Sequence, residues 1–218
     1  MPIALVLRKQ DASSVYRDLV FGSLRSEGMS ELHIASGFFR GDMAERLEKE
    51  TPDYSFTKAS GRIIHLYGAS NTSAVHQMVA LSNSLKGSGL NATASVQRTQ
   101  GENTPTWHAK MQVHVHQDAG PVIAVVGSSN MTMPAMLAHT ETGPQRNISL
   151  AQQEADVVMW LAGNQCASEV VRIARSEWGS EVLGREAFVD SKYDDEVKKL
   201  IDGAYDSLLK FDWERVDE

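Results

Sequence analysis

Cysteine is almost absent from this chain of 218 residues, in which Cys166 is the only one. A single cysteine excludes an internal disulfide and a zinc cluster built from thiolates, and both exclusions fit a reducing cytoplasm. Long apolar runs are missing as well: none approaches the roughly 18 residues that a membrane-spanning helix needs. The first ten residues hold too short an apolar stretch for a secretory signal. The sequence therefore predicts a cytoplasmic protein without a membrane anchor.

Basic residues are outnumbered: 21 Lys and Arg stand against 28 Asp and Glu, which gives a net charge of −7. Proteins that coat nucleic acid non-specifically carry a basic surface, because neutralising phosphates supplies most of their affinity. The net negative charge therefore argues against a protein that coats nucleic acid non-specifically. It is compatible with a local basic groove, since the electrostatic field inside a cleft does not follow the total charge.

Hydrophobic residues make up 42% of the chain, enough for the core of one sizeable domain spanning 1–218, with about 180–218 as a helical C-terminal extension. Short apolar runs alternate with amphipathic stretches, which predicts an α/β fold with a mixed, mostly parallel sheet flanked by helices. The acidic tail from Trp213 is expected to be solvated. Expected strands are 2–7, 32–35, 62–67, 92–96, 111–115, 122–126 and one within 155–161; expected helices are 13–25, 42–50, 72–85, 167–178 and 194–209.

Residues 108–116 read H-A-K-M-Q-V-H-V-H. In a strand, alternate residues share a face, so the apolar face holds residues 111, 113 and 115, and the opposite face holds His108, Lys110, Gln112, His114 and His116. The imidazole of His108 and the ammonium of Lys110 then stand about 7 Å apart, a spacing that suits one phosphate group. A solvated edge face is the alternative interpretation of this pattern.

The next apolar run, residues 121–126, leads directly into G-S-S-N-M-T. Gly127 would allow the backbone to approach a ligand closely, and Ser128 and Asn130 would supply neutral hydrogen-bond donors. If the two strands are neighbours, His108, Lys110, Ser128 and Asn130 surround one point.

These motifs resemble the phospholipase D superfamily, whose signature is H-x-K followed by G-[S/T]-x-N. The matching residues are His108 with Lys110, and Gly127 with Ser128 and Asn130. With one motif in the chain, the sequence is most similar to the single-motif, metal-independent nuclease branch, including the catalytic domains of phospholipase-D-like restriction endonucleases. Val115 stands where the family has an aspartate.

The resemblance implies that a homodimer builds one active site, with His108 from one chain as nucleophile and the second copy as general acid and base. Lysine, asparagine and serine would bind the phosphate oxygens, and neither a metal nor another cofactor is required. The family glutamate that orients the histidine corresponds to Glu141 by spacing, while the segment 147–149 matches another form of this element, with Ser149 in the acidic position.

The leading functional hypothesis is a metal-independent nuclease, with DNA favoured over RNA as the substrate and a role in a restriction or defence system with a partner protein as one form of it. The alternatives are a lipid phosphodiesterase or phosphatidyl transferase, and a non-catalytic phospholipase D-like binding module. His114 and His116 have the H-x-H spacing of metal sites, although no metal is expected there. His33 and His65 are interpreted as satisfied core or surface groups, and Arg40 as a phosphate contact or a structural ion pair.

Overall fold

The protein is described from a computed structural model that covers residues 2–8, 15–43, 45, 61–98, 107, 109–131, 154–176 and 191–217. The strands are β1 (Ile3–Arg8), β2 (Met29–Ser36), β3 (Ile63–Gly68), β4 (Asn91–Gln97), β5 (Lys110–His116), β6 (Gly120–Gly127), β7 (Glu154–Trp160) and β8 (Trp213–Arg215). The helices are α1 (Val15–Arg25), α3 (Thr72–Gly87), α5 (Gln165–Ser176) and α6 (Asp194–Leu209), with a 3₁₀ turn at Ser191–Tyr193. Most of the expected helix 42–50 lies outside the described residues.

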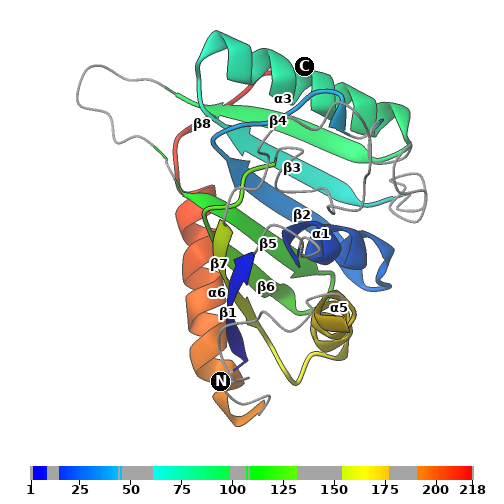
Figure 1. Ribbon diagram of the computed structural model, residues 1–218, viewed down its shortest axis with the longest axis vertical. Coiled ribbons are helices and arrows are strands. Elements are labelled where there is room, and N and C mark those ends of the chain that lie inside the picture. Colours follow the sequence, from blue (N-terminus) through cyan, green and yellow to red (C-terminus); the bar gives the residue numbers. More distant parts are fainter. Residues whose placement is uncertain are drawn as a thin grey trace.

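The strands form one sheet in the order β1-β7-β6-β5-β2-β3-β4-β8 (Figure 1). Among the pairings of the described strands, β2–β3 and β3–β4 are parallel and the other five are antiparallel. The prediction of a mixed sheet is confirmed, but the prediction that it is mostly parallel is wrong. The physical reason is the length of the connections. α3 provides the crossover that parallel β3 and β4 need, whereas the three-residue turn between β5 and β6 permits only an antiparallel hairpin.

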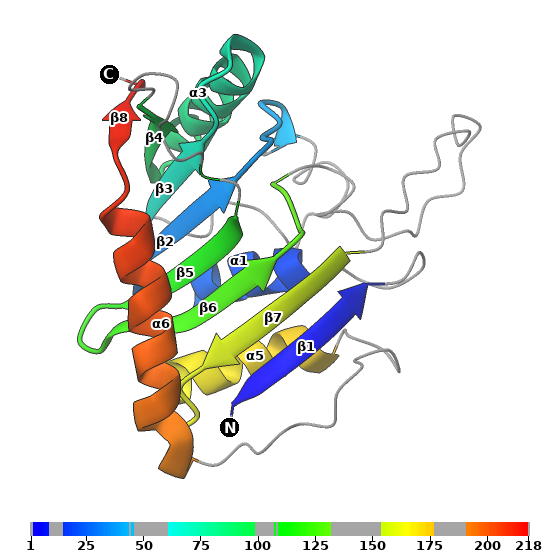
Figure 2. The same ribbon diagram turned by 90° about the vertical axis from the view of Figure 1, so that its left-hand side faces the viewer.

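The helices cover both faces of the sheet (Figures 1 and 2). α1, α3 and α5 lie on one face, where α1 and α5 approach closely because Gly22 carries no side chain against Val170. α6 lies on the other face and packs across β5, β6 and β7. We call these the α1 face and the α6 face.

Two helices show how the sequence sets their ends and their buried sides. Asn71 caps α3, its side chain accepting a hydrogen bond from the N–H of Ala74. α6 begins with three acidic residues, which stabilise the positive end of the helix dipole. It buries Val197, Ile201 and Leu208, which recur at helical spacing. The predicted bounds of α6, 194–209, are confirmed.

The polar side of β5 is a second core face rather than a solvated one. Gln112 and His114 are fully buried beneath α1. His114 Nδ1 lies 2.5 Å from Ser23 Oγ, and its Nε2 lies 3.0 Å from Gln112 Oε1. Gln112 Nε2 also donates to the carbonyl of Tyr16 at 3.3 Å. Because these polar groups have partners, they can be buried at low cost, and only the Lys110 end of this face reaches the sheet edge.

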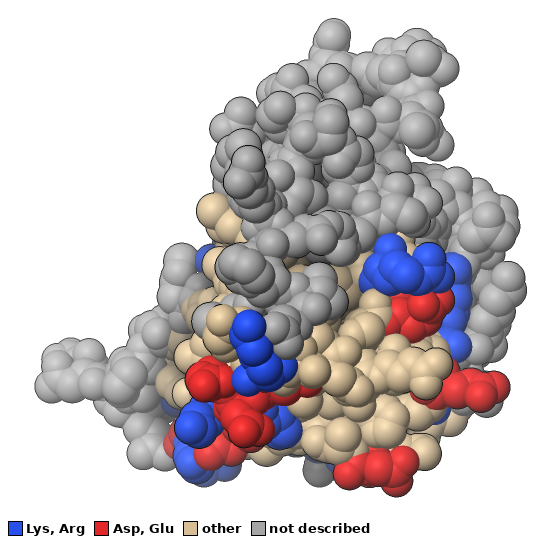
Figure 3. Space-filling view, turned by 90° about the horizontal axis from the view of Figure 1, so that it is seen from below, with Lys and Arg blue, Asp and Glu red and all other residues tan. Residues whose placement is uncertain are grey.

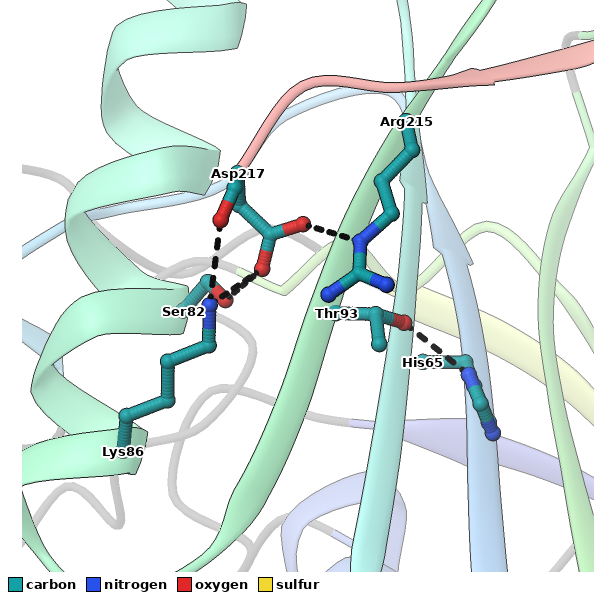
Figure 4. Close-up of polar contacts among 6 residues, drawn as sticks. All are labelled: His65, Ser82, Lys86, Thr93, Arg215 and Asp217. Atoms are coloured by element: carbon teal, nitrogen blue, oxygen red, sulfur yellow. Dashed lines mark hydrogen bonds and ion pairs between the residues drawn. The ribbon is translucent and has the colours of Figure 1, made fainter.

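The chain after α6 completes the sheet instead of extending into solvent. β8 pairs with β4, and Asp217 is buried, so the expectation of a solvated tail is wrong. Lys86, Ser82 and Arg215 donate to the Asp217 carboxylate at 2.7, 2.8 and 3.1 Å (Figure 4). Burial alone would raise the pKa of Asp217, but these hydrogen bonds outweigh it and hold that pKa well below its usual range. In the described part of the chain, no helix is both long and apolar enough to cross a membrane.

Candidate functional site

Four neighbouring strands bring polar residues or a glycine to one edge of the sheet. Lys110, at the start of β5, pairs with Gly127 at the end of β6, and Gly127 pairs with Asp156 of β7. On the other side of β5, Ala35 pairs with Met111, which places Ser36 of β2 beside Lys110. Cross-strand partners share a face, so these four positions form a row on the α1 face. β5, which begins at Lys110, and β6, which ends at Gly127, are therefore neighbours in the sheet.

The side chains of Lys110 and Asn130 converge over Gly37, the residue that follows β2. A methyl group on the Gly37 Cα would lie 3.5 Å from Asn130 Oδ1 and 3.8 Å from Lys110 Cε. Asn130 Oδ1, the atom near Gly37, also accepts from Ser36 Oγ at 3.3 Å. An ammonium and an amide in neighbouring positions can bind one oxyanion together, the ammonium through its charge and the amide through its N–H groups.

Backbone contacts between the chain after β2 and the chain after β6 hold this geometry. Phe39 and Met131 form a parallel bridge, and both side chains are buried. Ser36 Oγ accepts from the N–H of Met131 at 2.9 Å and donates to the carbonyl of Phe38 at 2.6 Å. Ser36 was missed from the sequence, because a serine at the end of a strand carries no signal of its own.

Ser128 is bound to β7 through two contacts with Ala155. The N–H of Ser128 donates to the Ala155 carbonyl at 3.0 Å, and Ser128 Oγ accepts from the Ala155 N–H at 2.9 Å. These contacts extend the pairing of β6 with β7 by one residue, so in this structure Ser128 has a clear architectural role.

Gly127 is required by the neighbouring strand. A Cβ on this residue would overlap the Asp156 carboxylate and the Ala155 carbonyl oxygen. The buried Asp156 carboxylate fills that space and accepts from the N–H and the hydroxyl of Ser129, at 3.2 and 2.5 Å. Asp156 was missed as a site candidate; the signal that could have found it is a lone carboxylate within the apolar run of β7.

Two of the predicted site residues, His108 and Glu141, lie outside the described residues, as does the alternative acidic segment 147–149. Trp107 and Ala109, which flank His108 in sequence, are described, and the indole N–H of Trp107 donates to the Ala109 carbonyl at 2.9 Å. Arg40 pairs with Asp42 at 2.7 Å on the surface, which is the structural alternative considered for it.

A second polar cluster lies on the α6 face and consists of Glu31, His33 and His65. We call it the β2–β3 cluster. Glu31 Oε2 is 3.0 Å from His33 Nε2 and 3.4 Å from His65 Nε2. The two imidazoles stack with their centroids 4.4 Å apart, because His33 and His65 are register partners on parallel strands. In the described part of the chain, this is the group of His, Cys, Asp or Glu residues whose arrangement could hold a metal ion.

Burial controls the titration of these histidines. It lowers the pKa of His33 to about 4, with a smaller contribution from repulsion by His65, and the hydrogen bond that Glu31 accepts offsets only part of this. Burial also lowers the pKa of His65, again partly offset by Glu31. The His33 ring is therefore neutral near pH 7.

The H-x-H pair on β5 does not form a joint site in the described residues. His114 is enclosed by Ser23 and Gln112, whereas His116 Nδ1 accepts from the turn amides of Asp118 and Ala119 at 3.1 and 3.3 Å. Burial lowers the pKa of His114 to about 3, with a smaller contribution from His33.

Acid is expected to destabilise the fold through His114. Its folded-state pKa of about 3 lies below the unfolded value of 6.5, so the unfolded chain takes up the proton first as the pH falls. The contribution is complete above pH 6.5 and is lost toward pH 3, at about 1.4 kcal/mol per pH unit. Denaturant unfolding from pH 7 to 5 would measure this slope. His114→Gln should reduce it, while replacing the exposed His76 by Gln should not; equal slopes in the two variants would contradict the assignment.

No family model matches this chain, and no curated protein matches it either. Similar solved structures exist. A polyphosphate kinase from Porphyromonas gingivalis is 14% identical and aligns over 84% of this chain and 27% of its own, with a TM-score of 0.44. NucT from Helicobacter pylori is 13% identical, over 83% of this chain and 98% of its own, with a TM-score of 0.39.

A yeast tyrosyl-DNA phosphodiesterase is 10% identical over 73% of this chain and 32% of its own, with a TM-score of 0.39. This chain therefore spans about a quarter to a third of the kinase and the phosphodiesterase, and nearly all of NucT.

Proposed function

We propose that the chain is a metal-independent nuclease in which His108 attacks a backbone phosphorus. His108 of the partner subunit protonates the leaving oxygen and then deprotonates the water that hydrolyses the phosphohistidine. Two equivalent histidines that hold different protonation states titrate as a coupled pair. The mechanism combines covalent catalysis with fixed charge around the transferred phosphoryl group.

The convergence of Lys110 and Asn130 over Gly37 is the observation that carries this proposal. The H-x-K motif requires its lysine to meet the asparagine of the G-S-x-N motif at one phosphate, although 20 positions separate them in sequence. The register of β5 with β6 brings them together at the sheet edge. The ammonium of Lys110 would offset the charge that develops on the phosphoryl oxygens.

Phe38 favours nucleic acid over a lipid as the substrate. Phe38 follows Gly37 directly and is 62% exposed, more than any other large apolar residue in the described part of the chain. An aromatic ring beside a phosphate-binding point offers a platform on which a base of a single strand can stack. On the face seen in Figure 3, acidic and basic side chains of the described residues lie interspersed.

The purified protein is expected to cleave DNA in excess EDTA. Single-stranded DNA, double-stranded DNA and RNA are incubated separately, and His108→Ala is the inactive control. Cleavage in EDTA that disappears in the variant supports a metal-independent phosphodiesterase acting through His108. Cleavage of none of the three polymers, or equal cleavage by His108→Ala, contradicts the proposal; hydrolysis of phospholipid vesicles in place of polymers would favour the lipid enzyme.

The same assay tests the shared site. Subunits of the unchanged chain and of His108→Ala are mixed in equal amounts and allowed to exchange. If both copies of His108 serve one site, the mixture has about one quarter of the activity of the same total amount of unchanged protein, since only one dimer in four keeps both histidines. If each chain carries its own complete site, about one half remains.

A further inference from the structure

The β2–β3 cluster directs three potential ligand atoms toward one another. They are Glu31 Oε2 and the Nε2 atoms of His33 and His65, all within 4.8 Å of one another. Ligand atoms about 2.0–2.1 Å from a tetrahedral zinc ion are about 3.3 Å apart. The two contacts of Glu31 Oε2, at 3.0 and 3.4 Å, already have this spacing.

The outer nitrogen of each imidazole is held by a hydroxyl group. His33 Nδ1 lies 3.0 Å from Tyr67 Oη, and His65 Nδ1 lies 2.9 Å from Thr93 Oγ1, a contact visible in Figure 4. When Nδ1–H donates to the hydroxyl oxygen, Nε2 keeps its lone pair and presents it to the cluster. Second-shell partners of this kind orient metal-bound histidines in proteins.

The cluster is open on one side. The side chain of His33 is buried, whereas those of Glu31 and His65 are 33% and 24% exposed. An ion can therefore enter from solvent, and a water molecule can complete a set of three protein ligands. The positive charge of Arg215 disfavours a cation near His65. Arg215 donates a hydrogen bond to the Asp217 carboxylate at 3.1 Å, and the negative charge of that carboxylate offsets part of the repulsion (Figure 4).

We propose that Glu31, His33 and His65 bind one Zn²⁺ ion. Two imidazoles and one carboxylate suit zinc, whereas Mg²⁺ and Ca²⁺ prefer oxygen ligands. The site lies on the α6 face, on the opposite side of the sheet from the row that contains Lys110. The proposed zinc site is separate from the proposed nuclease reaction. Removal of zinc should therefore leave the row that contains Lys110 unchanged.

Zinc binding is measured with the full chain, stripped of metal and titrated with Zn²⁺ against a chromophoric chelator. One equivalent is expected to bind, with a rise in Tm, and Mg²⁺ is expected to produce neither effect. Co²⁺ substitution should give the visible absorption of a tetrahedral site. Absence of stoichiometric binding, or an octahedral Co²⁺ spectrum, would overturn the proposal.

Variants locate the ion. Glu31→Gln and His65→Gln keep hydrogen-bonding groups in place and should no longer bind the equivalent of Zn²⁺. His76→Gln, at an exposed histidine of α3, should still bind it. Thr93→Val removes only the hydroxyl at His65 and should weaken binding by about 10-fold to 100-fold. Circular dichroism establishes that each variant is folded. Unchanged zinc affinity in folded Glu31→Gln and His65→Gln would place the ion elsewhere and refute the assignment.

Discussion

Lys110→Met is expected to lower kcat for phosphodiester cleavage by about 10²–10³-fold, in the range found when one preorganised electrostatic contact is lost. Methionine nearly keeps the length of the side chain, so it can still occupy the position over Gly37 where Lys110 Cε now lies. What is lost is the positive charge beside the phosphate oxygens. Steady-state kinetics on the preferred polymer, in EDTA, measure the effect.

The matched control is Lys210→Met. Lys210 follows α6, is exposed, and pairs with Asp206 at 2.7 Å, so the variant removes the same charge from a surface ion pair. Its kcat should equal that of the unchanged protein. A Lys110→Met variant that kept most of the original rate would mean that the phosphate does not bind at this edge of the sheet.

Gly127→Ala is expected to destabilise the fold by about 3 kcal/mol or more. The new methyl group would overlap the Ala155 carbonyl oxygen and the Asp156 carboxylate. Since one of these neighbours is backbone, β6 and β7 must separate to make room, and the hydrogen bonds from Ser129 to Asp156 would be lost with the register. Urea unfolding followed by circular dichroism measures the free energy of unfolding.

Gly203→Ala provides a control that is expected to change the free energy of unfolding in the opposite direction. Gly203 lies inside α6, and a Cβ on it would meet nothing within 4 Å. Alanine there should stabilise the protein by about 0.5–1 kcal/mol, because glycine loses more backbone entropy on folding. If Gly127→Ala were as stable as the original chain, the close packing of β6 on β7 would be refuted.

Local periodicity predicted most of the elements. The α6 range was predicted without error because its apolar residues recur at helical spacing after an acidic first turn. β6 was predicted because an unbroken apolar run between turn residues indicates a buried strand. β5 and β6, which are adjacent in sequence, do pair, as such strands most often do, but their register with Lys110 beside Gly127 comes from the structure.

Features that depend on distant pairing could not be predicted. Periodicity does not reveal strand direction, so the antiparallel majority was missed. β8 has only three residues and needs β4 to define it, which made the tail look solvated. His33 and His65 lie 32 positions apart in sequence, and only the parallel register of β2 with β3 shows that they stack. Asp156 likewise gains its place beside Gly127 from strand pairing alone.

The pairing of β1 with β7 has a consequence for the speed of folding. Ile3 pairs with Met159, so this contact closes a loop that contains most of the chain. Closing so long a loop costs conformational entropy before any hydrogen bond between β1 and β7 stabilises it. Proteins dominated by such long-range contacts fold slowly. Until β1 arrives, β7 presents an unpaired edge to solvent. Before β1 pairs with β7, folding chains are therefore most prone to associate with one another through the unpaired edge of β7.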